Sequence, residues 1–492
     1  MPLLYFMQAI PVTVVQELSE IVFKDLGIDN QHITQWTSII ALPWTIKLLW
    51  GPLVDATRTK RDWTLSLQWL LAGCLALTAF ALKLPNAFGI TLAIMTVTAL
   101  FSATCDIATD GYYLLAQNKE QQAANVGIQT AFYRLGRVFV VGLLVTLAGV
   151  LHERGMEQMS AWTVVLVGCS LVYAVGRGML TTLAPVSPLD DERSLPPGDA
   201  RRYVLLSVLV VVVGLAGYFV LNSLTRLAAH GFWLALGETV KGWRLSADAL
   251  NLEYIQLAAC LIITVFAGRL LARRLRGTEL ADSFGSFLSQ RSLIGIMLFL
   301  TFYRFGEAMV MKMAPLFLKD TVAAGGLALS DKLVGPITGL SGVLGLVAGG
   351  MIGGLVVSRL GLARSIWPIA ILMHLPHLGY IWASYAQPSA SLMHPVAFMD
   401  SFGYGFGYAA YVIVLQRVAQ QVPKFQTAHY AICTGLGALC IQVSGIFAGI
   451  VQANFGYHTF YWTALICAVP GILTLLLLPK ALTVTEQSPQ PV

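Results

Sequence analysis

Residues 47–61 read Lys-Leu-Leu-Trp-Gly-Pro-Leu-Val-Asp-Ala-Thr-Arg-Thr-Lys-Arg, the end of an apolar run followed by an acid and a basic cluster. Apolar runs of about 20 residues lie on both sides, and this length crosses a hydrocarbon core of ~30 Å as a helix. Clustered cations between such runs are typical of cytoplasmic loops. The stretch therefore predicts a short cytoplasmic loop between two transmembrane helices.

The composition of the whole chain indicates the same class of protein. Of its 492 residues, 57% are hydrophobic and 11% are charged, and the mean hydropathy is +0.71. A soluble domain carries about 25% charged residues, so a water-soluble surface is excluded. The net charge of +6 lies in short clusters between apolar runs, which favours lipid head groups over nucleic acid. The seven cysteines form no CxxC pair, and we expect buried thiols without a disulfide framework or metal site.

The apolar runs predict an all-α polytopic membrane protein with about 14 spans. Six spans lie in each half of the chain, and an inserted helix pair lies between the halves. The expected spans are 2–26, 34–54, 64–84, 88–116, 122–150, 160–184, 203–227, 252–272, 292–318, 333–357, 365–385, 395–421, 425–452 and 457–479. Cations concentrate in alternate loops, so both termini are expected in the cytoplasm.

This pattern divides the chain into five parts. They are an N-terminal six-helix half (1–184), a cytoplasmic linker (185–202), the inserted pair with its basic loop (203–291), a C-terminal six-helix half (292–480) and a polar tail (481–492). The first apolar run carries Gln8, Gln16, Glu17 and Glu20, and we expect a working helix there, not a removable signal peptide.

Two interpretations of residues 47–61 stay open. In the first, Gly51 lets two helices approach closely, Asp55 pairs with a cation or a helix N-terminus, and Lys47, Arg58 and Arg61 complete a cytoplasmic gate. In the second, the same residues are only a positive-inside anchor with a proline stop. Residues 349–364 carry a similar but weaker pattern of glycines and cations without the acidic residue. Their paired glycines fit plain helix packing equally well.

Charged residues inside the fourth and fifth spans are the first candidates for a transport site. Asp106 and Asp110 lie at i and i+4 and therefore share one helix face. Charges at membrane depth should not face lipid. The aspartates therefore line a cavity or pair with cations. Arg134 and Arg137 lie at a similar height and are candidate partners, in an ion pair that is either structural or part of proton coupling.

The first helix and its counterpart in the second half supply further candidates. Gln16 and Glu17 belong to the former, and Arg304, Glu307 and Lys312 to the latter. Helices at these places line the central cavity of two-repeat transporters. Alternatively, Glu20 and Lys312 lie near enough to helix ends to reach water.

An aromatic stripe lies in the span at 395–421. Tyr404, Tyr408 and Tyr411 recur at i, i+4 and i+7, a spacing that fits either stacking on sugar rings or helix packing. His374, His377 and other polar residues also lie within spans. A lone membrane histidine is more often a packed, hydrogen-bonded residue than a proton carrier.

Motifs of soluble enzymes are missing from the sequence, which has no P-loop, no HExxH and no nucleophile elbow. A transporter without a P-loop draws energy from an ion or substrate gradient, so we expect no cofactor and no enzymatic activity. A membrane-embedded enzyme or receptor is a remote alternative, in which the paired aspartates would be catalytic.

Three stretches together resemble a known family. They are residues 47–55, residues 106–111 (Asp-Ile-Ala-Thr-Asp-Gly) and residues 4–11 (Leu-Tyr-Phe-Met-Gln-Ala-Ile-Pro). They resemble the peptide, acetyl-coenzyme A and drug transporter branch of the major facilitator superfamily. The inserted helix pair and residues 302–308 are similar to AmpG-type muropeptide permeases.

The resemblance implies the major facilitator fold and proton-coupled import of N-acetylglucosaminyl-anhydromuramyl peptides across the bacterial inner membrane during cell-wall recycling. Siderophore, peptide, sugar or drug transport are alternatives within the superfamily. We expect protons, lipids and a small anionic solute as partners, no nucleic acid, and a monomer. The candidates for proton coupling are Asp106, Asp110, Glu17 and Glu307. The candidates for substrate binding, cations for carboxylates and rings for sugars, are Gln16, Trp44, Gln129, Tyr133, Arg134, Arg137, Arg304, Lys312 and Tyr404.

Overall fold

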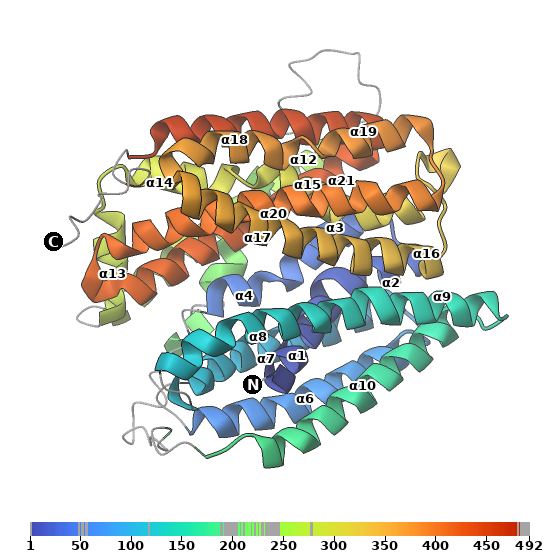
Figure 1. Ribbon diagram of the computed structural model, residues 1–492, viewed down its shortest axis with the longest axis horizontal. Coiled ribbons are helices and arrows are strands. Elements are labelled where there is room, and N and C mark those ends of the chain that lie inside the picture. Colours follow the sequence, from blue (N-terminus) through green and yellow to red (C-terminus); the bar gives the residue numbers. More distant parts are fainter. Residues whose placement is uncertain are drawn as a thin grey trace. The chain divides into compact units, whose positions relative to one another are not determined.

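The computed structural model describes residues 2–47, 50, 54, 58–116, 119–186, 190, parts of 205–231, 247–275, 279–479 and 482. These residues form helices and turns, with no strand among them (Figure 1). The all-α fold class predicted from the apolar runs is therefore confirmed.

Ten helical stretches of the described chain are long and apolar enough to cross a membrane. One of them, α21 (Gln426–Leu473), covers two predicted spans. Gly456, with φ 74° and ψ 178°, breaks the helical path between these two spans. A further helix, α20 (Ala390–Gln420), matches the span predicted at 395–421. The span predicted at 34–54 begins as α3 (Asn30–Ile40) and α4 (Leu42–Ile46), and its remainder lies largely outside the described residues. The span predicted at 203–227 also lies partly outside them.

The chain forms two compact units, Met1–Arg276 and Gly277–Val492. The second helix of the predicted inserted pair, α12 (Ala247–Leu275), ends just before the boundary. The five-part division of the chain stays a prediction.

In the first unit, two predicted spans are interrupted by π-helical turns. Besides α3, α4 and α12, the helices of this unit are α1 (Pro2–Thr13), η1 (Val14–Leu18), α2 (Ser19–Asp25), α6 (Lys60–Ala81), α7 (Ala87–Ala116), α8 (Lys119–Arg137), η3 (Val138–Leu144), α9 (Val145–Glu153) and α10 (Gln158–Leu183). The π-helical turns η1 and η3 contact each other. Such turns are frequent at functional sites, because the extra residue shifts the side chains that follow.

In this unit, α1 and α8 pack closely against each other. A Cβ at Gly136 would come within 2.7 Å of the Ala9 Cβ and the Phe6 carbonyl oxygen, so only glycine fits there. α1 also packs against α7. The first helix therefore lies in contact with both helices that carry the candidate aspartates and arginines.

In the second unit, α17 and α20 run side by side (Figure 1). The helices of this unit are α13 (Glu279–Leu288), α14 (Leu293–Phe302), α15 (Phe305–Lys319), α16 (Asp331–Gly335), η5 (Pro336–Ser341), α17 (Gly342–Leu360), α18 (Leu362–His374), α19 (His377–Ala386), α20 and α21, with short 3-10 turns at η4 (Val322–Ala324), η6 (Pro423–Phe425) and η7 (Thr474–Leu477). A Cβ at Gly345 or Gly349 would clash with the carbonyl oxygens of Phe398 and Phe402 on α20. Close helix packing therefore accounts for Gly349 in the glycine-rich segment 349–364.

Two helix breaks in the second unit lie beside polar residues. Tyr303 and Arg304 separate α14 from α15, and Leu375 and Pro376 separate α18 from α19. Irregular backbone at membrane depth is tolerated only where protein buries it or where it lines a water-filled cavity. These breaks place Arg304 and His377 at or next to interruptions of a helix.

Candidate functional site

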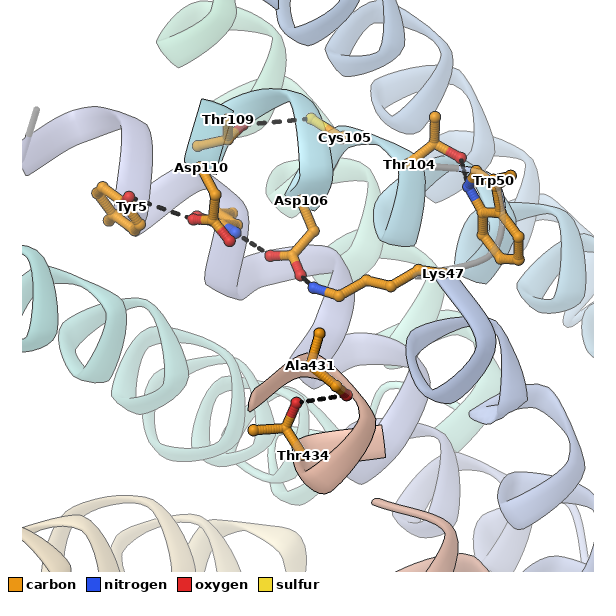
Figure 2. Close-up of polar contacts among 11 residues, drawn as sticks. Tyr5, Lys47, Trp50, Thr104, Cys105, Asp106, Thr109, Asp110, Ala431 and Thr434 are labelled. Atoms are coloured by element: carbon orange, nitrogen blue, oxygen red, sulfur yellow. Dashed lines mark hydrogen bonds and ion pairs between the residues drawn. The ribbon is translucent and has the colours of Figure 1, made fainter. Parts of the chain in front are cut away.

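The two aspartates of α7 face the first helix. Gln8 Nε2 donates to Asp106 Oδ1, and the ammonium of Lys47 pairs with Asp106 Oδ2 (Figure 2). The Tyr5 hydroxyl donates to Asp110 Oδ1 at 3.3 Å. The i, i+4 spacing thus places both carboxylates on one face, as predicted.

The partners of these aspartates differ from the expected ones. Among the described residues, Asp106 contacts Gln8 and Lys47, and the arginines of α8 do not pair with it. The reason is the position of α1, which packs against both α7 and α8. The aspartates therefore meet side chains of α1 and the cation that follows α4. Asp106 is thus paired with a cation, as one of the alternatives expected, but this cation is Lys47 and not an arginine of α8.

Arg137 instead pairs with Glu17. Its Nε lies 2.8 Å from Glu17 Oε1 and 3.0 Å from Oε2. Glu17 lies in η1, and Arg137 is the last residue before η3, so the ion pair joins the first and fifth spans where their π-helical turns meet. The two side chains keep 34% and 24% exposure, which leaves both groups accessible to water or a solute.

The remaining candidates of the first unit are spread along these helices. Gln129, Tyr133 and Arg134 are exposed in part on the turns of α8 that precede Arg137. Gln16 is half-buried next to Glu17. Trp44 packs against the cluster of Trp50, Val54, Ala103 and Ala108, and its indole Nε1 is buried without a hydrogen-bond partner.

The predicted cytoplasmic gate is described only in part. Gly51 and Asp55 lie outside the described residues, and Lys47 is held by Asp106. Arg58 has a left-handed φ of 53° and an exposed side chain. Arg61 donates to the carbonyl oxygens of Ala184 and Thr181, each at 2.9 Å. Of the predicted gate residues, Arg61 thus binds the end of α10, and the gate itself stays a prediction.

Sequence reasoning missed Asp190 in the predicted linker. Its carboxylate accepts the backbone N–H groups of Lys60 at 2.7 Å and Arg61 at 2.9 Å. These are the first two residues of α6, so Asp190 satisfies free donors at a helix N-terminus. The acidic run at 190–192 was the available signal, but nothing in the sequence links it to a helix 130 residues earlier.

In the second unit, the tyrosine stripe surrounds a buried cation. The Arg304 guanidinium lies 4.8 Å from the ring centroid of Tyr404, 5.0 Å from that of Tyr408 and 5.7 Å from that of Tyr411. Arg304 Nη2 pairs with Glu307 Oε2 at 3.2 Å, and these side chains are 5% and 3% exposed. Arg304 Nε has no hydrogen-bond partner. The three rings therefore form cation–π contacts, a role that neither interpretation of the stripe included.

Lys312, the last candidate, lies five residues after Glu307 on α15 and is buried. The structure thus brings together Asp106 and Lys47, Glu17 and Arg137, and Arg304, Glu307 and Tyr404. No group of three or more metal-ligating side chains occurs within the described part of the chain.

Comparisons with known proteins find sequence similarity to membrane transporters. The model of the BT1 family matches residues 14–187. The chain is 21% identical over 492 residues to the putative transporter AmpG 4 of Rickettsia felis, covering 98% of this chain and 96% of that protein. It is 23% identical over 455 residues to the anhydromuropeptide permease of Escherichia coli K12, covering 91% of this chain and 73% of that protein.

Solved transporters share the fold. A POT family transporter in complex with a thioalcohol-conjugated peptide superposes with a TM-score of 0.64 at 14% identity, covering 98% of this chain and 95% of that one. The inward-open xylose transporter XylE of E. coli gives a TM-score of 0.57 at 12% identity, covering 97% and 94%.

The helices that are long and apolar enough to cross a membrane and the superposition on solved transporters show a multi-pass helical fold of the major facilitator type. Within that class the chain is similar to the AmpG-type permeases, as residues 47–55 and 106–111 predicted.

Proposed function

We propose that this chain is a proton-coupled symporter that imports muropeptides across the bacterial inner membrane by alternating access. The observation that carries the proposal is that carboxylates within the spans are paired with cations: Asp106 with Lys47, Glu17 with Arg137 and Glu307 with Arg304. Similarity to the anhydromuropeptide permease of E. coli supports the substrate class.

Such pairs couple a proton to an anionic solute by charge balance. A carboxylate that takes up a proton no longer neutralises its cation, and an unpaired cation at membrane depth is costly. A carboxylate of the solute then replaces the protein carboxylate as partner of Arg137 or Arg304. Proton binding and solute binding therefore favour each other, and by linkage this coupling is reciprocal.

The surroundings of Arg304 support a role in binding the solute. The three tyrosine rings hold the guanidinium in one orientation, so little conformational freedom remains to be lost on binding. Its Nε is free of a protein acceptor. A planar guanidinium with a free N–H fits a carboxylate, of which a muropeptide carries several, better than a neutral sugar or an apolar drug.

The orientation of the chain follows from its cations. With the loop at 58–61 on the cytoplasmic side, both termini face the cytoplasm. Uptake then moves the solute toward the side that carries Arg58 and Arg61.

The proposal is tested with purified protein in liposomes. Uptake of labelled N-acetylglucosaminyl-anhydromuramyl tripeptide is measured with and without an imposed proton gradient, for the wild type and for Glu17→Gln and Glu307→Gln. We expect gradient-driven accumulation by the wild type and its loss in both variants. The exposed loop carboxylate of Glu157 supplies the matched control, Glu157→Gln, which should behave as the wild type.

Competition with unlabelled compounds identifies the solute class in the same assay. Excess muropeptide should abolish uptake, whereas a ferric siderophore, a free peptide or a free disaccharide should not. Wild-type uptake that is the same with and without the proton gradient would contradict proton coupling. Competition by a siderophore as strong as that by muropeptide would contradict muropeptide as the substrate.

A further inference from the structure

Two buried histidines and a partly buried aspartate form a chain of titratable side chains in the second unit, apart from the Arg304–Glu307 pair. His374 Nδ1 lies 3.2 Å from His377 Nε2, and His377 Nδ1 lies 2.9 Å from Asp400 Oδ1. The two imidazoles are 3% and 0% exposed. His374 ends α18, His377 begins α19, and Asp400 lies on α20, so three helices meet at this chain.

The hydrogen bonds leave two consistent placements of the protons. With Asp400 ionised, His377 donates through Nδ1 to Asp400, and His374 donates through Nδ1 to His377 Nε2. The outer nitrogen of His374, Nε2, is then a bare acceptor, and this buried atom has no hydrogen-bond partner. This nitrogen is therefore the one position on the two rings that is open to a further proton.

The second placement results from adding one proton. A proton that arrives at His374 Nε2 releases the Nδ1 proton to His377 Nε2, and His377 in turn releases its Nδ1 proton to Asp400. Both rings are neutral again with reversed tautomers, and Asp400 is a neutral acid. One proton has entered, and the total charge has changed from −1 to 0. The Tyr303 carbonyl, which interacts with His374, faces the ring that now carries the Nε2 proton.

Titratable groups from the neighbouring helices face this chain. Glu307 of α15 interacts electrostatically with both Asp400 and His377, and it is the partner of Arg304. Tyr380 of α19 and Tyr461 of α21 interact with Asp400, and the two rings stack 5.3 Å apart. Because like charges repel strongly where water is excluded, a proton on Asp400 favours ionised Glu307, and an ionised Asp400 favours a proton on Glu307.

We propose that His374, His377 and Asp400 form a proton-binding relay whose charge state controls the ionisation of Glu307 and thereby the Arg304–Glu307 pair. The ligand of this site is a single proton. The inference rests on the proposed proton-coupled function, since it names the groups of the second unit that load and unload the proton.

A first experiment tests proton binding without any transported solute. The protein is labelled with 15N-histidine in detergent, and the signals of His374 and His377 among its eight histidines are assigned with His374→Gln and His377→Gln. As the pH is varied, we expect both rings to change tautomer together. Asp400→Asn should fix the tautomers, and Asp400→Glu should restore the joint change. If both rings keep one tautomer at every pH, and Asp400→Asn leaves their 15N signals unchanged, the relay is overturned.

A second experiment tests coupling in liposomes with labelled muropeptide. For His377→Gln we expect gradient-driven uptake to fall about tenfold or more, while exchange of internal for external muropeptide at equal pH stays within about twofold. His429→Gln is the matched control, because His429 is buried and contacts the neutral groups Ser283, Ser286 and Gln290.

The two experiments separate the two proposals. A wild type that takes up no muropeptide refutes the proposed substrate, and the tautomer measurement still decides the relay. A wild type with gradient-driven uptake that His377→Gln leaves unchanged overturns the relay alone.

Discussion

Arg137 Nε lies 2.8 Å from Glu17 Oε1 at the point where the π-helical turns of the first and fifth spans meet. Neither turn is required by the apolar pattern of its span. Each shifts the side chains that follow it, so the ion pair depends on the local helix geometry as much as on the two residues.

Removing one member of this pair should destabilise the protein more than removing both. Arg137→Gln leaves Glu17 as an uncompensated charge, which costs about 3–5 kcal/mol where the pair is buried and less at this partly exposed site. Glu17→Gln/Arg137→Gln leaves no charge and should recover most of the loss. Thermal unfolding of the detergent-solubilised variants checks this, and additive losses in the double variant would contradict it.

The glycines of α17 offer a matched pair for the packing against α20. Gly349→Ala places a methyl group against the Phe402 carbonyl oxygen, whereas a Cβ at Gly354 meets open space. We expect Gly349→Ala to lower the unfolding temperature and Gly354→Ala to leave it unchanged or raise it, since alanine favours the helix. Equal effects of the two substitutions would show that α17 and α20 do not pack this closely.

The tyrosines around Arg304 should act through their rings. Tyr408→Phe keeps the aromatic face at 5.0 Å and should leave the KM for muropeptide nearly unchanged, whereas Tyr408→Leu removes it and should raise the KM severalfold. Arg304→Lys keeps the charge but loses the planar guanidinium, so we expect a larger rise. Initial rates of uptake measure these effects. A KM for Tyr408→Phe as high as that for Tyr408→Leu would indicate that the hydroxyl acts instead of the ring.

Asp190 should stabilise the start of α6. Asp190→Ala removes the acceptor of two backbone N–H groups, and the loss of a helix cap typically costs ~1 kcal/mol. Asp190→Asn keeps an acceptor oxygen and should cost less. The order wild type, Asn, Ala in thermal unfolding is the expected result, and identical unfolding of all three would contradict the cap.

The spacing of residues predicted correctly which side chains share a helix face. It did not predict which side chains they contact. The i, i+4 spacing placed Asp106 and Asp110 on one face, and the stripe of Tyr404, Tyr408 and Tyr411 also proved to share one. The side chains that meet those faces depend on which helices are neighbours. Since α1 packs against both α7 and α8, Asp106 meets Lys47, and the arginines of α8 do not reach it.

Other features depend on contacts that are distant in the sequence. Lys60 and Asp190 are separated by 130 residues, and His377 and Asp400, on two different helices, by 23 residues. Apolar periodicity reports only which residues face apolar surroundings, so it cannot reveal these partners.

The most direct measurement of the central claim follows protons while the solute moves. Liposomes containing the protein and a trapped pH-sensitive dye are mixed with unlabelled muropeptide at equal pH on both sides. Symport predicts that the interior acidifies as muropeptide enters, and that Glu17→Gln and Glu307→Gln abolish this signal. A parallel assay with labelled muropeptide confirms entry, and entry without any change of internal pH would contradict proton coupling.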